Sequence, residues 1–130
     1  MSELHALLIG IDAYLPNEIE GVGYYPCLQG CVRDVERVEA YLKTRLPMPL
    51  AGIEKLTATA AGSGAKEPSE PQERWPTYAN MVAAFERLTG AARPGDAVYI
   101  HYSGHGNQAS THFPLIKGVA GLDEVLVPVD

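Results

Sequence analysis

Apolar residues run almost without interruption over Leu4–Ile11, which is typical of a β-strand buried on both faces of a sheet. After Gly30 the apolar residues change to the spacing of one helix face, at Cys31, Val35, Val38 and Leu42. Pro47 and Pro49 follow this pattern and cannot continue a helix. The sequence therefore predicts a buried strand, a loop over residues 12–26 and an amphipathic helix.

The same alternation continues toward the end of the chain. Thr77 is a good N-cap residue and precedes a second apolar helical pattern. Four further elements are predicted: a strand over Ile53–Thr59, a helix over Tyr78–Leu88, a strand over Asp96–Tyr102 and an extended run over Glu124–Val129. Residues 60–76 contain a Gly-Ser-Gly triplet, several charges and three prolines. We interpret them as a flexible linker within one domain, residues 1–130.

The order strand, helix, strand, helix, strand is that of a parallel sheet with helices on its faces. We therefore assign the chain to the α/β class. In such sheets, functional groups collect beyond the carboxyl ends of the strands. The loop that begins at Asp12 and the segment that follows Tyr102 both belong at this edge. They are expected to form one site together with the helix start around Cys31 and Asp34.

The composition fits one globular domain, or part of one, because 46% of the 130 residues are hydrophobic and 20% are charged. The formal net charge of -6 argues against nucleic-acid binding, which needs a basic surface. No apolar run approaches the roughly 20 residues of a membrane span, and Met1–His5 lacks the basic start of a signal peptide. Two cysteines without such a signal predict reduced thiols and a cytoplasmic location.

The strongest chemical signal is His105, which follows the third predicted strand and lies between two glycines. Histidine exchanges protons near neutral pH, and the glycines allow a sharp turn and leave room for a substrate. Zinc is not predicted, because His101 and His105 have a metal-binding spacing only on a helix. Cys27 and Cys31 likewise lack two further ligands. We therefore expect His105 to act in acid–base chemistry.

Several segments resemble, in order, the catalytic domain of metacaspases and of their bacterial relatives, the orthocaspases: Ala6–Ile11, Leu28–Val35, Pro76–Thr77, Gly95–Asp96, Tyr102–Gly106 and Asp123–Asp130. Together they extend over most of the chain, and the main parts outside them are residues 12–26 and 60–75. The resemblance implies a caspase-like three-layer fold, with a mostly parallel central sheet flanked by helices. It also implies that this chain holds the N-terminal part of that fold.

The resemblance further implies the roles of five residues. His105 matches the catalytic histidine of a cysteine peptidase, and Gly106 matches the residue whose backbone N–H stabilises the oxyanion. Cys31, Asp34 and Ser103 match positions that line the pocket for the substrate residue before the scissile bond. A carboxylate in that pocket favours Arg or Lys. The implied partner is therefore a peptide or protein with Arg or Lys at that position.

The nucleophile is expected outside this sequence. In caspases it lies about 50 residues after the histidine, whereas both cysteines here precede His105 and the sequence ends at Asp130. Cys31 lies near a helix N-terminus, which favours a thiolate, but its match to a pocket wall and its apolar helix face favour a buried role. We expect the cysteine on a C-terminal remainder of the domain, either cleaved off as a second chain or truncated here; loss in a degenerate homologue is the third alternative.

Two functions remain open from the sequence. The first is a cysteine endopeptidase that cleaves after Arg or Lys, with this chain supplying the histidine and part of the pocket. The alternative is a non-catalytic caspase-like module that binds partners through the same cleft. The resemblance also raises calcium as a cofactor, with Asp123, Glu124 and Asp130 as candidate ligands. Solvated turn charges are the favoured interpretation of these three residues.

Overall fold

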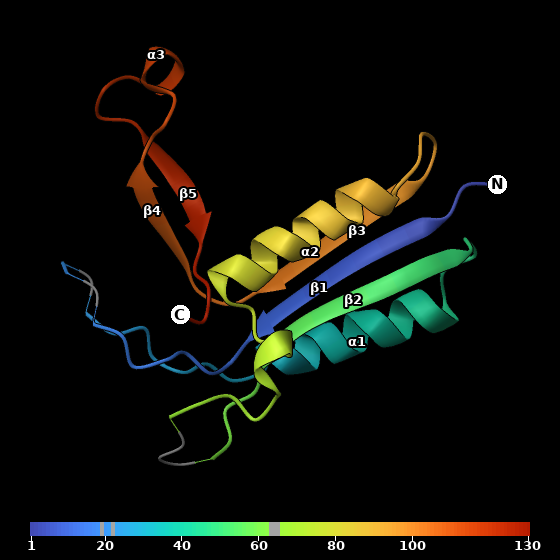
Figure 1. Ribbon diagram of the computed structural model, residues 1–130, viewed down its shortest axis with the longest axis horizontal. Coiled ribbons are helices and arrows are strands. Elements are labelled where there is room, and N and C mark those ends of the chain that lie inside the picture. Colours follow the sequence, from blue (N-terminus) through green and yellow to red (C-terminus); the bar gives the residue numbers. More distant parts are fainter. Residues whose placement is uncertain (19, 22, 63–65) are drawn as a thin grey trace.

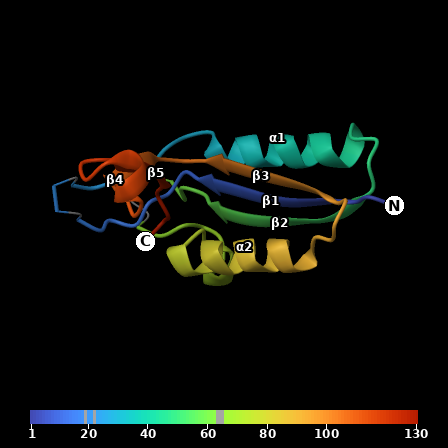
Figure 2. The same cartoon turned by 90° about the horizontal axis from the view of Figure 1, so that it is seen from above.

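A computed structural model describes residues 1–18, 20–21, 23–62 and 66–130. Its central sheet contains three parallel strands in the order β2-β1-β3. The strands are β1 (Leu4–Ile11), β2 (Leu50–Ala58) and β3 (Ala97–Ser103). Helix α1 (Cys31–Thr44) covers one face of the sheet and helix α2 (Tyr78–Ala91) covers the other (Figure 2). The predicted α/β alternation and the parallel sheet between two helical layers are confirmed.

Strand β1 lies in the middle of the sheet, which explains its continuous apolar sequence. Successive side chains point to opposite faces, so the residues alternate between two cores. Leu7, Ile9 and Ile11 are buried on the α2 side, whereas Leu4, Ala6 and Leu8 are buried on the α1 side. Gly10 permits close packing of α1, because a Cβ atom there would lie 2.7 Å from the Cys31 carbonyl oxygen.

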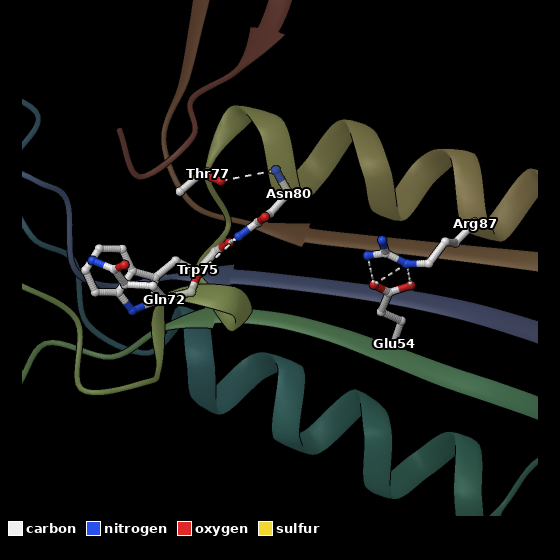
Figure 3. A network of polar contacts seen from close by, with 6 residues as sticks. All are labelled: Glu54, Gln72, Trp75, Thr77, Asn80 and Arg87. Atoms are coloured by element: carbon white, nitrogen blue, oxygen red, sulfur yellow. Dashed lines mark hydrogen bonds and ion pairs between the residues drawn. The ribbon is translucent and has the colours of Figure 1, made fainter.

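The two long helices begin in different ways. Thr77 caps α2 as predicted, since its hydroxyl accepts a 3.1 Å hydrogen bond from the Asn80 N–H (Figure 3). Helix α1 has Gly30 at its N-cap, with φ 98° and no side chain to offer. The carboxylate of Asp12, at the end of β1, replaces the missing cap by accepting hydrogen bonds from the N–H groups of Cys31 at 2.8 Å and Val32 at 3.3 Å.

Much of the segment expected to be a linker makes specific contacts. Pro68 is buried and pairs with Ala60 in an isolated β-bridge. Glu70 accepts a 2.8 Å hydrogen bond from the Thr59 N–H. Trp75 is 7% exposed, and Asn80 Nδ2 donates to its carbonyl oxygen at 2.8 Å (Figure 3). An exposed flexible linker was expected over residues 60–76, whereas Pro68 and Trp75 are buried. Residues 63–65 of this segment lie outside the described part.

A hairpin follows the central sheet and extends away from it (Figure 1). It pairs β4 (Gly106–Ser110) with β5 (Leu122–Leu126) in antiparallel fashion, and α3 (Pro114–Lys117) lies at its tip. Neither β4 nor α3 was predicted from the sequence. The extended run predicted over Glu124–Val129 is a strand only as far as Leu126. Beyond that point Val129 is buried in the core, where its N–H donates to the Pro76 carbonyl at 3.0 Å.

Within the described ranges, no helix is both long enough and apolar enough to cross a membrane.

Candidate active site

The candidate site lies where β1 and β3 end at the same edge of the sheet (Figure 1). Gly10 of β1 pairs with Ser103 of β3, so the loop after Ile11 and the turn after Ser103 begin side by side. The N-terminus of α1 reaches the same edge through the bonds from its N–H groups to Asp12. The predicted meeting of these three segments is therefore found in the structure.

Three residues that the resemblance assigned to one pocket lie together. Ser103 donates a 3.2 Å hydrogen bond from its hydroxyl to Asp34 Oδ2, which joins the end of β3 to the first turn of α1. Cys31 is 8% exposed at the start of the same helix, near enough to Ser103 for that hydroxyl to lower the pKa of its thiol. Asp34 and Ser103 are half-buried. The cluster therefore presents a partly accessible carboxylate beside a buried thiol.

The environment of Cys31 favours a protonated thiol. Burial raises the pKa of the Cys31 thiol, and this outweighs the Ser103 hydroxyl, which lowers that pKa. The carboxylates of Asp12 and Asp34 raise the pKa further, because a second negative charge beside them is unfavourable. A thiolate is the reactive form of cysteine. These surroundings oppose a nucleophilic role for Cys31 and suit a pocket wall.

The imidazole of His105 is fixed by one hydrogen bond and two aromatic rings. Its Nε2 atom lies 2.9 Å from the carbonyl oxygen of Pro26. Since a carbonyl only accepts, Nε2 carries the proton and Nδ1 is left with its lone pair. The ring centroids of Tyr14 and Tyr25 lie 4.9 Å and 5.4 Å from that of His105. The orientation therefore leaves Nδ1 as the basic atom of the neutral ring.

Two tyrosine hydroxyls hold the backbone on either side of this histidine. Tyr14 Oη accepts a 2.7 Å hydrogen bond from the His105 N–H, and Tyr102 Oη donates toward the His105 carbonyl at 2.6 Å. Burial raises the pKa of both phenols, so the hydroxyls stay protonated. A Cβ atom at Gly104 would lie 2.7 Å from Tyr102 Oη and 2.8 Å from Tyr14 Oη. The glycine expected to admit a substrate instead admits these two hydroxyls.

Gly106 lies at the start of β4 with its N–H directed away from the partner strand. The Val127 N–H donates to the His105 carbonyl at 3.1 Å, and Gly106 is paired with Leu126. In an antiparallel ladder, this places Gly106 and Leu126 in a pair without mutual hydrogen bonds. The N–H of Gly106 therefore remains available, next to His105, to donate to another group.

A hollow of about 430 Å³ borders the aromatic rings around His105. It is lined by Tyr14, Pro16, Tyr24, Tyr25, Pro26, Cys27 and Lys66. A second, more apolar hollow of about 540 Å³ lies between the C-terminal half of α1 and the start of β3, where Leu42 and Ala97 form part of its wall. The smaller of these two hollows is the one beside the residues that contact His105, so volume alone does not identify the site.

The acidic residues considered for calcium have separate partners. Asp123 binds the ammonium group of Lys117 at 2.7 Å, and Glu124 accepts from the side chain of Gln108 at 2.7 Å. Asp130 accepts from the backbone N–H of Tyr78 at the start of α2. In the described part of the chain, no group of three or more His, Cys, Asp or Glu side chains is placed to hold a metal ion. These residues do not fit a calcium site.

Sequence reasoning missed several residues that shape this site: Asp12, Tyr14, Tyr25, Pro26, Tyr102 and Asn107. Asn107 Nδ2 donates to the hydroxyl of Tyr25, which links the hairpin to the loop after β1. Tyr14 and Tyr25 lie in a loop that sequence patterns describe only by its turn-forming composition. The three tyrosines at positions 14, 24 and 25 could have indicated that this loop packs against the site, because aromatic residues are unusual in a solvated loop.

Known proteins with similar sequences belong to one family. Residues 5–130 match the family model of the metacaspase, peptidase C14 domain. Metacaspase-1A of Aspergillus oryzae is 35% identical over 127 residues, which are 96% of this chain and 25% of that protein. Metacaspase-1 of Schizosaccharomyces pombe shows the same 35% identity over 127 residues, again 96% and 25% of the two chains. Metacaspase-2 of Arabidopsis thaliana is 35% identical over 103 residues, 79% of this chain and 22% of the relative.

The parallel sheet between two helical layers, with a histidine just beyond the carboxyl end of β3, defines the N-terminal part of a caspase-like α/β fold. The chain belongs to the metacaspase family, as the match over residues 5–130 shows. It spans about a quarter of the length of the curated relatives, at 22% to 25% of each.

Proposed function

We propose that the intact protein is a cysteine endopeptidase that cleaves peptide bonds after Arg or Lys. The observation that carries this proposal is the bond from His105 Nε2 to the Pro26 carbonyl at 2.9 Å, because it leaves Nδ1 free as a base at the edge of the sheet. Membership in the metacaspase, peptidase C14 family supports the reaction type. The nucleophilic cysteine is supplied by the part of the domain that follows Asp130.

In this mechanism His105 Nδ1 takes the proton of the cysteine thiol, and the thiolate attacks the carbonyl carbon of the scissile bond. The Gly106 N–H donates to the oxyanion that forms, an interaction worth roughly 10²–10³ in rate at such sites. The imidazolium then protonates the leaving amine as the carbon–nitrogen bond breaks. Water hydrolyses the resulting thioester and returns the cysteine and His105 to their starting forms.

The proposed specificity depends on the cluster of Cys31, Asp34 and Ser103. Asp34 is held by Ser103 at 3.2 Å and is only half-buried, so a carboxylate oxygen remains able to meet a substrate cation. A guanidinium or ammonium group that loses its hydration needs such a partner. The carboxylate repels an acidic side chain in the same pocket. The proposed partners are therefore proteins or peptides with Arg or Lys before the cleaved bond.

The free edge of β3 supports a place for the remainder of the domain. In the described residues, β3 pairs with β1 and no strand pairs with its other side. Val98 and Ile100 on β3 are each 47% exposed, which is unusual for apolar residues of a sheet interior. We propose that the C-terminal part of the domain covers them.

We also propose a cytoplasmic location for the protein. The free thiols of Cys27 and Cys31 suit a reducing compartment.

Cleavage of matched fluorogenic peptides by the intact protein tests the proposal. Peptides that end in Arg, Lys and Asp should give activity on the first two and little on the third. Asp34→Asn should lower kcat/KM for the Arg peptide by about 10²-fold, because a desolvated cation loses its charge partner. Glu36→Gln is the matched control, since Glu36 is exposed on the same helix. Preference for the Asp peptide would refute the specificity, and absence of cleavage would favour the non-catalytic module.

A further inference from the structure

The side chains of Tyr25 and Asn107 join two segments that both contact His105. Asn107 lies two residues after the histidine, at the start of the hairpin, and its Nδ2 donates to Tyr25 Oη. Tyr25 directly precedes Pro26, whose carbonyl accepts from His105 Nε2 at 2.9 Å. The contacts form a closed circuit that runs from the imidazole through Pro26, Tyr25 and Asn107 back to the histidine. Each member of the circuit restricts the position of the next.

The aromatic packing strengthens this circuit. The rings of Tyr14 and Tyr25 lie 5.9 Å apart by their centroids, and each also contacts the His105 ring. Tyr25 is half-buried and Pro26 is exposed, so burial alone does not hold the Pro26 carbonyl in place. A proline has no N–H with which to anchor itself. The hydrogen bond from Asn107 to the Tyr25 hydroxyl therefore restrains the residue next to the Pro26 carbonyl.

We propose that the Tyr25–Asn107 hydrogen bond is a device that keeps the neutral His105 imidazole in the tautomer with its proton on Nε2. Without this bond, Tyr25 and the adjoining Pro26 carbonyl lose their tie to the hairpin, and the proton redistributes between Nε2 and Nδ1. A ring with its proton on Nδ1 cannot take a proton from a thiol at that atom. Tyr25 and Asn107 are thus positioning residues for the histidine. This inference rests on the proposed role of His105 as the base.

The tautomer is measured directly by ¹⁵N NMR of the intact protein labelled at histidine, at a pH where the imidazole is neutral. The His105 signals are assigned by their absence in His105→Gln. We expect the unmodified protein to show Nε2–H, and Tyr25→Phe and Asn107→Ala to shift at least about a third of the population to Nδ1–H. In Tyr25→Phe the ring that packs on His105 is kept, so only the hydroxyl contact is removed. Gln108→Ala is the control, because Gln108 is exposed on the same strand and binds Glu124 instead.

The kinetic consequence separates positioning from general loss of structure. Tyr25→Phe and Asn107→Ala should each lower kcat by about tenfold, with KM changed less than about twofold, because misplacement of an acid–base group affects the chemical step. The double variant should be no slower than either single variant, since both remove one hydrogen bond. Asn107→Gln, which keeps the amide donor, should recover part of the lost rate.

An unchanged tautomer in Tyr25→Phe would overturn the inference, whatever the activity. Additive losses in the double variant would also overturn it. A changed tautomer in a protein that cleaves no peptide would leave the circuit in place and contradict the proposed function instead.

Discussion

The hydroxyl of Ser103 at the end of β3 donates a 3.2 Å hydrogen bond to the carboxylate of Asp34 in the first turn of α1. The two residues are 69 positions apart in the sequence, and their contact joins a strand to a helix. The same hydroxyl lowers the pKa of the nearby Cys31 thiol. One hydrogen bond therefore connects the carboxylate proposed to bind substrate with the end of the strand that leads to His105.

The two cysteines should react with iodoacetamide at very different rates. Cys27 is exposed, whereas Cys31 is buried and burial raises the pKa of its thiol. At about pH 8 we expect Cys27 to be alkylated roughly tenfold faster than Cys31, since the thiolate is the reactive form. Mass spectrometry of the alkylated peptides measures both rates. Ser103→Ala should slow Cys31 further, because the Ser103 hydroxyl lowers that pKa. Equal rates for Cys27 and Cys31 would contradict the described environment.

The raised pKa of Cys31 also predicts a loss of stability in alkaline solution. Above its ordinary pKa of about 8.5 the thiol of the unfolded chain ionises, while the folded protein still holds the proton. The folded state then binds more protons than the unfolded state, so the free energy of unfolding falls as the pH rises. Urea denaturation between pH 7 and pH 10 should show this fall, and Cys31→Ser should reduce it. A steeper fall in Cys31→Ser would show that the sign is wrong.

Removal of the Asp12 carboxylate should destabilise the protein through helix α1. Asp12 is 8% exposed and accepts from the N–H groups of Cys31 and Val32, at a helix start where Gly30 offers no side chain. Loss of such a cap costs about 0.5–2 kcal/mol. We expect Asp12→Ala to lower the free energy of unfolding by about 2 kcal/mol in urea denaturation. Asp12→Asn keeps one acceptor oxygen and should lose less. A smaller effect of Asp12→Ala than of Asp12→Asn would contradict the capping role.

A methyl group at position 104 should be costly. It would lie 2.7 Å and 2.8 Å from the hydroxyl oxygens of Tyr102 and Tyr14, which hold the backbone of His105. Overpacking of this kind costs about 1–3 kcal/mol, and we expect Gly104→Ala to lower the midpoint of urea denaturation accordingly. Gly52→Ala is the control, because a Cβ atom at Gly52 on β2 meets nothing within 4 Å. Equal stability of the two variants would show that the space at Gly104 is not restricted.

The sequence predicts the parts of the fold in which local pattern and tertiary packing agree. The continuous apolar run of β1 becomes the central strand, and Thr77 caps α2 because a capping hydroxyl acts within its own helix turn. The hairpin strand β4 was missed, because its sequence Gly-Asn-Gln-Ala-Ser has low β-propensity and is held by its pairing with β5. For residues 12–26 the sequence predicts a loop that begins at the sheet edge, but not the contacts that this loop makes.

The candidate site divides in the same way. His105, Asp34 and Ser103 could be proposed from the sequence because they lie in segments that resemble metacaspase motifs. The hydrogen bonds that orient them depend on atoms from distant parts of the chain, such as the Pro26 carbonyl oxygen, which contacts His105. Every residue has a backbone carbonyl, so the residue type at position 26 does not predict this contact. The cap of α1 by Asp12 likewise spans 19 residues and follows no local capping pattern. Residue types are readable from a chain, whereas the contacts between distant backbone atoms require the fold.

The most direct test of the account is the effect of one histidine on cleavage of an Arg-ended fluorogenic peptide by the intact protein. His105→Ala should lower kcat/KM by about 10²–10⁴-fold, since the general base and acid is removed. His112→Ala should remain within about twofold, because His112 is exposed in the hairpin and is separate from the ring cluster around His105. A large loss confined to His105→Ala is the predicted result. Activity that is unchanged by His105→Ala would contradict the central claim.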